Sequence, residues 1–262
     1  MSVTDAGPAQ GSNAVRDPER NRLMSTDPLT TLERNGCAVC PTRIVCTARN
    51  LDDQLLDQLA DCIDTSAVLQ RNDYLYRLGD PGESCYVVRS GVFKTMTLSA
   101  SGEEFVTGFH YPGELLGLSG QATGEHSDSA QALAASTACA IRSDDFPEIF
   151  AIGAGQSLLR LIAEREHNDR CLENNLRQSK AECRIAGYLV VLIQRLQRLG
   201  FDGRVLPTPM SQTDLANHLG LTLECLSRVF GKWRRAGLIA TEKDSITILN
   251  PKALDALTCH LL

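Results

Sequence analysis

Two short helices joined by a tight turn are predicted near the C-terminal end, and few folds contain such a pair in this order. Ser211 and Thr222 can cap the two helices, because a hydroxyl oxygen accepts a hydrogen bond from a free amide of the first turn. Gly220 permits the positive φ that a tight turn between helices needs. One apolar face spans both helices: Leu215, Leu219, Leu221, Leu226 and Val229. This pattern predicts a helix-turn-helix.

The second helix of this pair carries side chains suited to reading DNA. Glu224, Ser227 and Arg228 lie three and four residues apart and therefore share one face. A carboxylate can accept from cytosine N4, and a guanidinium can donate to guanine O6 and N7. Basic residues further along can contact phosphates: Lys232, Arg234 and Arg235. An ordinary helix pair with a solvated basic face is the alternative, but it leaves the joint occurrence of caps and triplet unexplained.

Composition limits where a polyanion can bind and where the chain resides. The 262 residues carry a net charge of −6, so a nucleic-acid site has to be a local basic patch. The sequence contains no apolar run of about 18 residues and no apolar N-terminal signal segment. We therefore expect a cytoplasmic protein without a membrane span, of one or two domains with two favoured.

The residue pattern changes along the chain from polar to β-rich to helical, and this order predicts an α+β fold. Residues 1–35 are polar and are expected to form a disordered leader, followed by a cysteine-rich loop at 36–50. A short helix is predicted at Leu51–Cys62. Short β-rich runs separated by glycine-bearing turns then predict an antiparallel roll within residues 51–150: Asp73–Arg77, Cys85–Arg89, Val92–Leu98, Phe105–His110 and Ala138–Ile141.

Residues beyond the roll are predicted to be mostly helical. One or two helices are expected between Gln156 and Arg198, with residues 151–180 forming a dimerisation helix. Residues 181–262 are expected to form a winged helix-turn-helix, in which a turn-rich hinge at Gly200–Pro209 precedes the helix pair. The wing is a hairpin at Leu238–Leu249 that turns at Lys243 and Asp244.

The predicted dimerisation helix has a seam with a coiled-coil spacing. Steps of three and four residues give Leu159, Ile162, Glu166, Asp169, Glu173, Leu176 and Lys180. In a parallel homodimer each acid of this seam would face its own copy, and like charges in a partly desolvated seam repel. The alternative is a rotated helix in which the acids face solvent and a different set is inside: Leu158, Leu161, Cys171 and Leu172.

Ten cysteines without an export signal favour a metal or redox site over a disulfide scaffold. Cys37, Cys40 and Cys46 lie within one short loop, and such a set suits zinc or an iron–sulfur cluster, both of which accept a fourth sulfur ligand. Spacing alone does not choose the fourth ligand among the remaining cysteines: Cys62, Cys85, Cys139, Cys171, Cys183, Cys225 and Cys259.

From Gly36 to its end the chain resembles the CRP/FNR family of bacterial transcription regulators, and within it the FNR-type anaerobic branch. Three matches carry the resemblance. They are the spacing of the N-terminal cysteines, the segment from Ser129 to Cys139, and the triplet of Glu224, Ser227 and Arg228. The implied fold is a cyclic-nucleotide-binding-like β-roll sensor domain, a long dimerisation helix and a C-terminal winged helix-turn-helix.

The resemblance also implies a function and a cofactor. A 4Fe-4S cluster would be held by Cys37, Cys40, Cys46 and Cys139. This oxygen-labile cluster would favour a homodimer that binds a palindromic DNA operator with TTGAT-like half-sites and controls anaerobic gene expression together with RNA polymerase. Ile44 and Val45 are expected to screen the cluster from solvent.

Two further features bear on the alternatives. Gly113, Glu114 and Leu115 resemble the start of a cyclic-nucleotide pocket, but no Arg or Lys occurs from Gly113 to Ile141, where a phosphate-binding Arg is needed near Ser129. We therefore expect no cyclic nucleotide. The sequence shows no constellation typical of an enzyme, and no catalysis is expected. The alternatives are a zinc- or thiol-based regulator of the same fold and a cluster-bearing electron-transfer protein.

Overall fold

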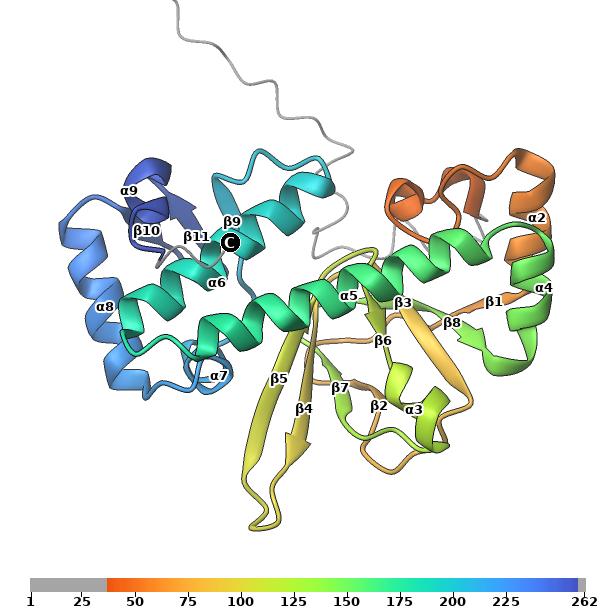
Figure 1. Cartoon of the computed structure of the whole chain (residues 1–262), viewed down its shortest axis with the longest axis horizontal. Coiled ribbons are helices and arrows are strands. Elements are labelled where there is room, and N and C mark those ends of the chain that lie inside the picture. Colours follow the sequence, from red (N-terminus) through yellow and green to blue (C-terminus); the bar gives the residue numbers. More distant parts are fainter. Residues whose placement is uncertain (1–36, 259–262) are drawn as a thin grey trace, which may run out of the picture.

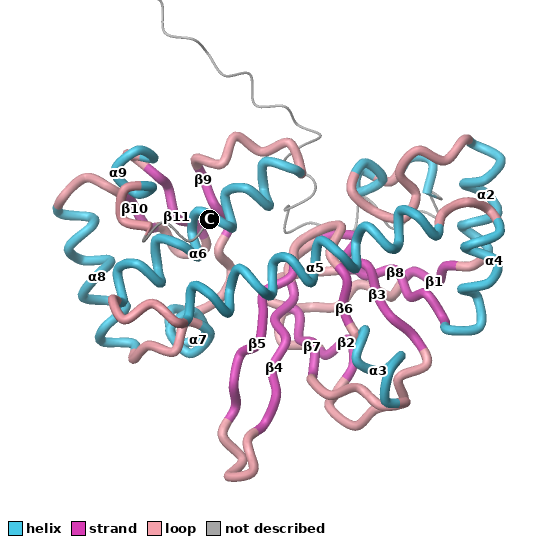
Figure 2. The backbone as a smooth tube through the Cα atoms, viewed as in Figure 1, coloured by secondary structure: helices cyan, strands magenta, loops and turns pink. Residues whose placement is uncertain are grey.

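The computed structural model of the chain describes residues 37–258 (Figure 1). The predicted leader at 1–35 lies outside the described residues. A β-roll, a long helix and a smaller C-terminal unit follow one another along the chain (Figure 2). We call residues 63–142 the roll and residues 181–258 the C-terminal unit. None of the described helices is long and apolar enough to cross a membrane.

The roll consists of two antiparallel sheets, with strand orders β1-β8-β3-β6 and β2-β7-β4-β5. Its strands are β1 (Ile63–Thr65), β2 (Tyr74–Tyr76), β3 (Ser84–Ser90), β4 (Phe93–Leu98), β5 (Glu104–His110), β6 (Leu115–Leu116), β7 (Ser129–Ala132) and β8 (Thr137–Arg142). Each predicted β-rich run overlaps one of these strands. The sequence did not single out β1, β6 or β7, because two to four residues are too few to display an alternation.

Helices and short 3-10 turns pack around the roll. These are η2 (Cys37–Val39), η3 (Pro41–Ile44), α2 (Asp53–Asp61), α3 (Leu118–Thr123), η4 (Ser143–Asp145) and α4 (Phe146–Ala151). The side chain of Asp52 accepts a hydrogen bond from the Leu55 amide and so begins α2, within the helix predicted there. Leu56 and Leu59 of α2 are buried in the same apolar cluster as Ile141 of β8.

The long helical region divides into α5 (Gly155–Leu176) and α6 (Ala181–Arg198), which pack against each other. The chain reverses between them, as Figure 2 shows. Asn175 closes the turn by donating from Nδ2 to the Arg184 carbonyl at 2.7 Å. Gly187 faces Asn175 at so short a distance that a Cβ there would come within 2.2 Å of the amide oxygen. A glycine is therefore needed for this close approach.

The C-terminal unit contains the predicted helix pair and a larger sheet than predicted. Its elements after α6 are β9 (Val205–Pro207), α7 (Gln212–His218), α8 (Leu223–Arg235), β10 (Ile239–Thr241), β11 (Ser245–Ile248) and α9 (Pro251–Asp255). The predicted hairpin is formed by β10 and β11, and β9 adds a third strand from the segment interpreted as a hinge. Pro207 lies on an edge strand, where its missing amide removes no ladder bond.

The roll and the C-terminal unit share one apolar core. Phe109 and Tyr111 of the roll belong to the same buried cluster as Tyr188 of α6 and Leu215 of α7. Tyr111 also donates from its hydroxyl to the Pro207 carbonyl at 3.0 Å. The roll and the C-terminal unit therefore contact each other mainly through buried, packed side chains.

His218 lies in this shared core and predicts a pH dependence of stability. Burial lowers the pKa of His218 to about 4, below an unfolded value of about 6.5. Between these two pKa values His218 is protonated in the unfolded chain but neutral in the folded chain. The free energy of unfolding therefore falls as the pH falls from 6.5 towards 4. At about pH 5 the expected loss from this group is about 2 kcal/mol.

Urea unfolding at about pH 7.5 and about pH 5 measures this loss. His218→Gln lowers the free energy of unfolding at both pH values through poorer packing, but its drop between them is expected to be smaller than that of the parent. Buried His110, whose pKa is lowered mainly by burial and least by His218, is retained in both proteins, so most of its contribution is common to them. Equal drops in the two proteins would contradict the assignment.

Candidate metal centre and nucleic-acid interface

The four cysteines expected to bind a cluster line one cavity. Cys37 lies in η2, Cys40 precedes η3 and Cys46 follows it, while Cys139 lies in β8. Strand pairing places Cys139 between Thr65 of β1 and Val87 of β3. Apolar side chains, among them Ile63 and Val88, line the cavity together with the polar side chains of Thr42, Thr47 and Arg89. Sheet pairing thus brings a cysteine from a distant strand under the N-terminal loop.

Burial dominates the electrostatics of these thiols. Burial, with a smaller contribution from neighbouring cysteines of the same cavity, raises the pKa of Cys46 and that of Cys139 to about 12. The amide of Ala48 donates to Cys46 Sγ at 3.3 Å. Because a metal binds thiolates, loading this site would release protons.

Polar contacts fix the loop that carries three of the cysteines to the roll and to the segment before α2. Thr42 donates from Oγ1 to the Arg89 carbonyl at 2.6 Å, and Arg43 donates from Nη2 to the Leu51 carbonyl at 2.6 Å. Ile44 is 56% exposed and is not among the residues that line the cavity, so its position does not support the expectation that it screens the site. Val45 packs on Gly113 instead and lines a different cavity.

The other cysteines near this region lie apart from the cavity. Cys85 is fully buried on β3 opposite Ile141, and Cys62 ends α2. Across residues 37–258, no three His, Cys, Asp or Glu side chains converge tightly enough to hold a single metal ion. The four thiols thus line a shared cavity instead of converging on the position of one metal ion.

The helix pair has the predicted local structure. Ser211 Oγ accepts from the Asp214 amide at 3.0 Å, and Thr222 Oγ1 accepts from the Cys225 amide at 3.2 Å. Gly220 has a φ of 61° in the turn between α7 and α8. The predicted apolar face is buried, except that Leu221 is partly exposed.

The predicted DNA-contacting residues differ in how they are held. Glu224, Ser227 and Arg228 are exposed on α8. Arg235 is exposed as well, while Arg234 donates from Nη1 to Thr241 Oγ1 at 2.9 Å. Lys232 donates from Nζ to Glu182 of α6 at 2.7 Å, so a phosphate contact by Lys232 requires this ion pair to open.

The seam predicted on the long helix is uncovered in the single chain. Leu159 is 56% exposed and Ile162 is 38% exposed, whereas Leu158 and Leu161 are buried in the chain's own core. Cys171 and Leu172 line the cleft between α5 and α6. The two residue sets considered from the sequence thus lie on opposite faces of α5. The set with Leu158 and Leu161 faces the chain's own core, and the set with Leu159 and Ile162 faces outward.

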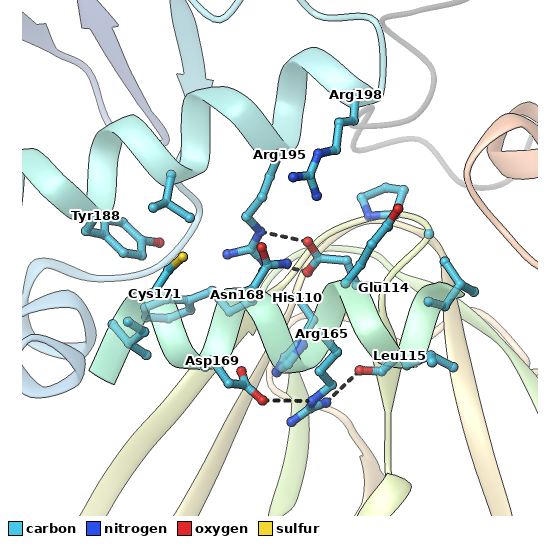
Figure 3. A pocket seen from close by; sticks show the side chains of 18 of the residues that line it. His110, Glu114, Leu115, Arg165, Asn168, Asp169, Cys171, Tyr188, Arg195 and Arg198 are labelled. Atoms are coloured by element: carbon cyan, nitrogen blue, oxygen red, sulfur yellow. Dashed lines mark hydrogen bonds and ion pairs between the residues drawn. The ribbon is translucent and has the colours of Figure 1, made fainter. Parts of the chain in front are cut away.

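Arginines of the same helix accompany two of the seam acids. Asp169 pairs with Arg165 at 3.4 Å, and Glu166 pairs with Arg170. Arg165 also donates to the Leu115 carbonyl at 2.7 Å, as Figure 3 shows. The acids of the seam are therefore partly neutralised before any partner arrives.

Comparison with known proteins agrees with this arrangement. Residues 183–257 match the family described as "Crp-like helix-turn-helix domain", and residues 67–152 match "Cyclic nucleotide-binding domain". The chain is 37% identical over 224 residues to "Transcriptional activator protein Anr" of Pseudomonas protegens, covering 84% of this chain and 91% of that protein. It is 32% identical over 235 residues to "Fumarate and nitrate reduction regulatory protein" of Escherichia coli, covering 87% and 94%. The chain belongs to the CRP/FNR family.

Solved structures share this fold at low sequence identity. FixK2 from Bradyrhizobium japonicum superposes with a TM-score of 0.66 at 22% identity, covering 76% of this chain and 99% of that one. A CooA mutant from Carboxydothermus hydrogenoformans gives a TM-score of 0.61 at 14% identity, covering 81% and 94%. The roll, long helix and helix-turn-helix predicted from the sequence are therefore confirmed as a CRP/FNR fold.

In this CRP/FNR-family chain, Glu114 forms an ion pair, which the resemblance to a cyclic-nucleotide pocket did not predict. Glu114, which resembles part of a cyclic-nucleotide pocket, binds Arg195 of α6 through both carboxylate oxygens, with Nε to Oε1 at 2.7 Å (Figure 3). Burial lowers the pKa of Arg195, but Glu114 more than offsets this, so that the net shift is upward. No periodic pattern reveals this pair, because its members are 81 residues apart.

Proposed function

We propose that the chain is an oxygen-responsive, DNA-binding transcription regulator whose iron–sulfur cluster promotes dimerisation and operator binding. The observation that carries the proposal is the single cavity lined by Cys37, Cys40, Cys46 and Cys139. The names of the relatives, which describe a transcriptional activator and a regulator of fumarate and nitrate reduction, support it. Control of anaerobic gene expression, with RNA polymerase as a partner, is part of the proposal.

The donor set fits a four-iron cluster better than one zinc ion. Four thiolates are the usual ligands of such a cluster, and hydrogen bonds to sulfur tune it. The Ala48 amide supplies one such bond to Cys46. A cluster is wider than a single ion, which suits thiols that surround a space. When bound, the cluster supplies the oxygen-labile group, while Thr42 holds the loop against the roll and Arg43 fixes it to the segment before α2.

The DNA-binding part of the proposal rests on α8. Arg228 reads guanine and Glu224 the cytosine edge in each half of a palindromic site with TTGAT-like half-sites. Ser227 lies between them on the same face, and phosphates are contacted by the basic residues of the helix: Lys232, Arg234 and Arg235. The proposal requires neither a cyclic nucleotide nor a catalytic group.

The visible spectrum and metal content of protein purified without oxygen test the proposal. The expected result is a brown protein containing iron and sulfide that bleaches in air, and that binds the palindromic duplex only before bleaching. A colourless protein that contains zinc and binds the duplex equally in air would support the zinc-based alternative and overturn the proposal. A cluster that survives air, with no effect on DNA binding, would favour electron transfer.

We further propose that α5 pairs with a second copy through the exposed seam, consisting of Leu159, Ile162, Glu166, Asp169, Glu173 and Leu176. Asp169→Ala is then expected to strengthen the cluster-free dimer, because two like charges leave the interface. Because Arg165 already pairs with Asp169, the gain is modest, about fivefold in the dissociation constant. DNA binding in air is expected to rise with it, at unchanged cluster content.

Sedimentation of the aerobic protein measures this effect. The matched control is Glu164→Ala, which removes an acid that pairs with Arg160 on the same helix but lies outside the seam. If both variants associate as weakly as the parent, or if the parent is already a tight dimer in air, the acidic seam does not limit dimerisation.

A further inference from the structure

The free edge of the roll is occupied by the first helix of the helix-turn-helix. β5 ends the sheet order β2-β7-β4-β5, so its outer backbone groups need partners. Asn217 of α7 accepts from the Val106 amide at 2.7 Å and donates to the Glu104 carbonyl at 3.0 Å. His218 Nδ1 lies 3.1 Å from the Val106 carbonyl, the distance of a third such bond. Two neighbouring side chains of α7 thus replace a strand.

Charged side chains also pair across this contact. Lys94 of β4 is only 8% exposed, and its ammonium group donates to Asp214 of α7 at 3.1 Å and to Glu104 at 3.5 Å. Arg195 of α6 binds Glu114 and the Phe109 carbonyl. Because buried charges are costly without partners, these pairs specify one position of the C-terminal unit on the roll.

This position sets the β4–β5 hairpin beside the first helix of the helix-turn-helix. In helix-turn-helix complexes the first helix crosses the DNA backbone while the second lies in the major groove. Here α7 has the β4–β5 hairpin beside it, and the hairpin extends past the helix (Figure 1). Glu103 and Glu104 are exposed on that hairpin, whereas its Lys94 is buried. A phosphate backbone that follows α7 would meet a strand edge bearing carboxylates.

We propose that the contact between α7 and β5 is autoinhibitory, so that α7 has to leave β5 before the chain binds DNA. The contact holds the DNA-binding unit in a resting position through Asn217, His218 and Lys94. Releasing it exposes α7 and removes the acidic edge.

The cysteine loop contacts the segment that holds the resting position. Val45, next to Cys46, packs so tightly on Gly113 that a Cβ there would lie 2.5 Å from Val45 Cγ2. Glu114 follows Gly113 and binds Arg195. A shift of the loop on cluster binding would therefore disturb the Glu114–Arg195 pair. This link rests on the proposed function, whereas the autoinhibitory contact itself does not require a cluster.

Asn217→Ala in the cluster-free chain tests the contact. It removes the acceptor of the Val106 amide, so hydrogen exchange of β5 is expected to accelerate. With two hydrogen bonds fewer in the resting state, affinity for DNA is expected to rise about tenfold. Fluorescence anisotropy measures the affinity with two duplexes, one with inverted TTGAT half-sites and one of unrelated sequence at low salt. Lys94→Gln is expected to act in the same direction.

Gln131→Ala is the matched control, because its amide donates to the Asn72 carbonyl within the roll and does not reach the C-terminal unit. It is expected to leave exchange of β5 and DNA affinity unchanged. Unaltered exchange of β5 in Asn217→Ala overturns the proposal, and so does faster exchange without tighter binding to either duplex. Tighter binding to the unrelated duplex alone supports autoinhibition but contradicts the TTGAT assignment. If protein purified without oxygen contains no iron and sulfide, the proposed cluster is contradicted, but the autoinhibitory contact is not.

Discussion

Cys139→Ser is expected to remove most of the iron and sulfide that the chain takes up under anaerobic reconstitution. The substitution leaves a hydroxyl where a thiolate is needed, in a cavity whose three other sulfur atoms come from the N-terminal loop. Cys37, Cys40 and Cys46 variants are expected to behave in the same way. The substitution also abolishes the anaerobic rise in DNA affinity, because no cluster then acts on the dimer.

Two cysteines outside the cavity serve as controls. Cys62→Ser and Cys85→Ser are expected to keep their iron and sulfide. Cys85 is fully buried, so its variant loses stability and its folding is checked by thermal melting before metal analysis. If Cys139→Ser retains full content while either control loses it, the fourth ligand is assigned wrongly.

Cys139, the proposed fourth ligand, also shows how much cysteine spacing alone can predict. Cys37, Cys40 and Cys46 form a recognisable set because they share one loop. Cys139 joins them only through the pairing of β8 with β1 and β3, which no local pattern encodes. The resemblance to the CRP/FNR family pointed to Cys139, and the structure places it on the same cavity.

Local signals predicted the helix pair well, because its caps and its glycine turn act within a few residues. Ser211, Thr222 and Gly220 each have the predicted role. The contact of α7 with β5 was not predicted, since an amide such as Asn217 looks the same whether it faces solvent or a strand edge. Long-range polar partners depend on the complete fold, and periodicity carries no information about them.

The second prediction with a large expected effect concerns DNA binding by α8. Arg228→Ala is expected to weaken binding to the palindromic duplex by about 1–3 kcal/mol, roughly five- to 150-fold, because the bidentate hydrogen bonds to guanine are removed. The effect is confined to the intact site: duplexes in which that guanine is already replaced are expected to bind parent and variant alike. Anisotropy with a set of single-base variants measures this at one salt concentration.

Arg235→Ala is the matched control for Arg228→Ala, because both arginines are exposed on α8. Binding to a phosphate carries no sequence information, so Arg235→Ala is expected to weaken all duplexes equally. The slope of log affinity against log salt is expected to fall by about 0.9 for each phosphate that the variant no longer neutralises. Arg228→Ala, in contrast, changes the ranking of the duplexes. An equal drop in affinity on every duplex for Arg228→Ala would place its guanidinium on the phosphate backbone and leave Glu224 as the remaining candidate for base recognition.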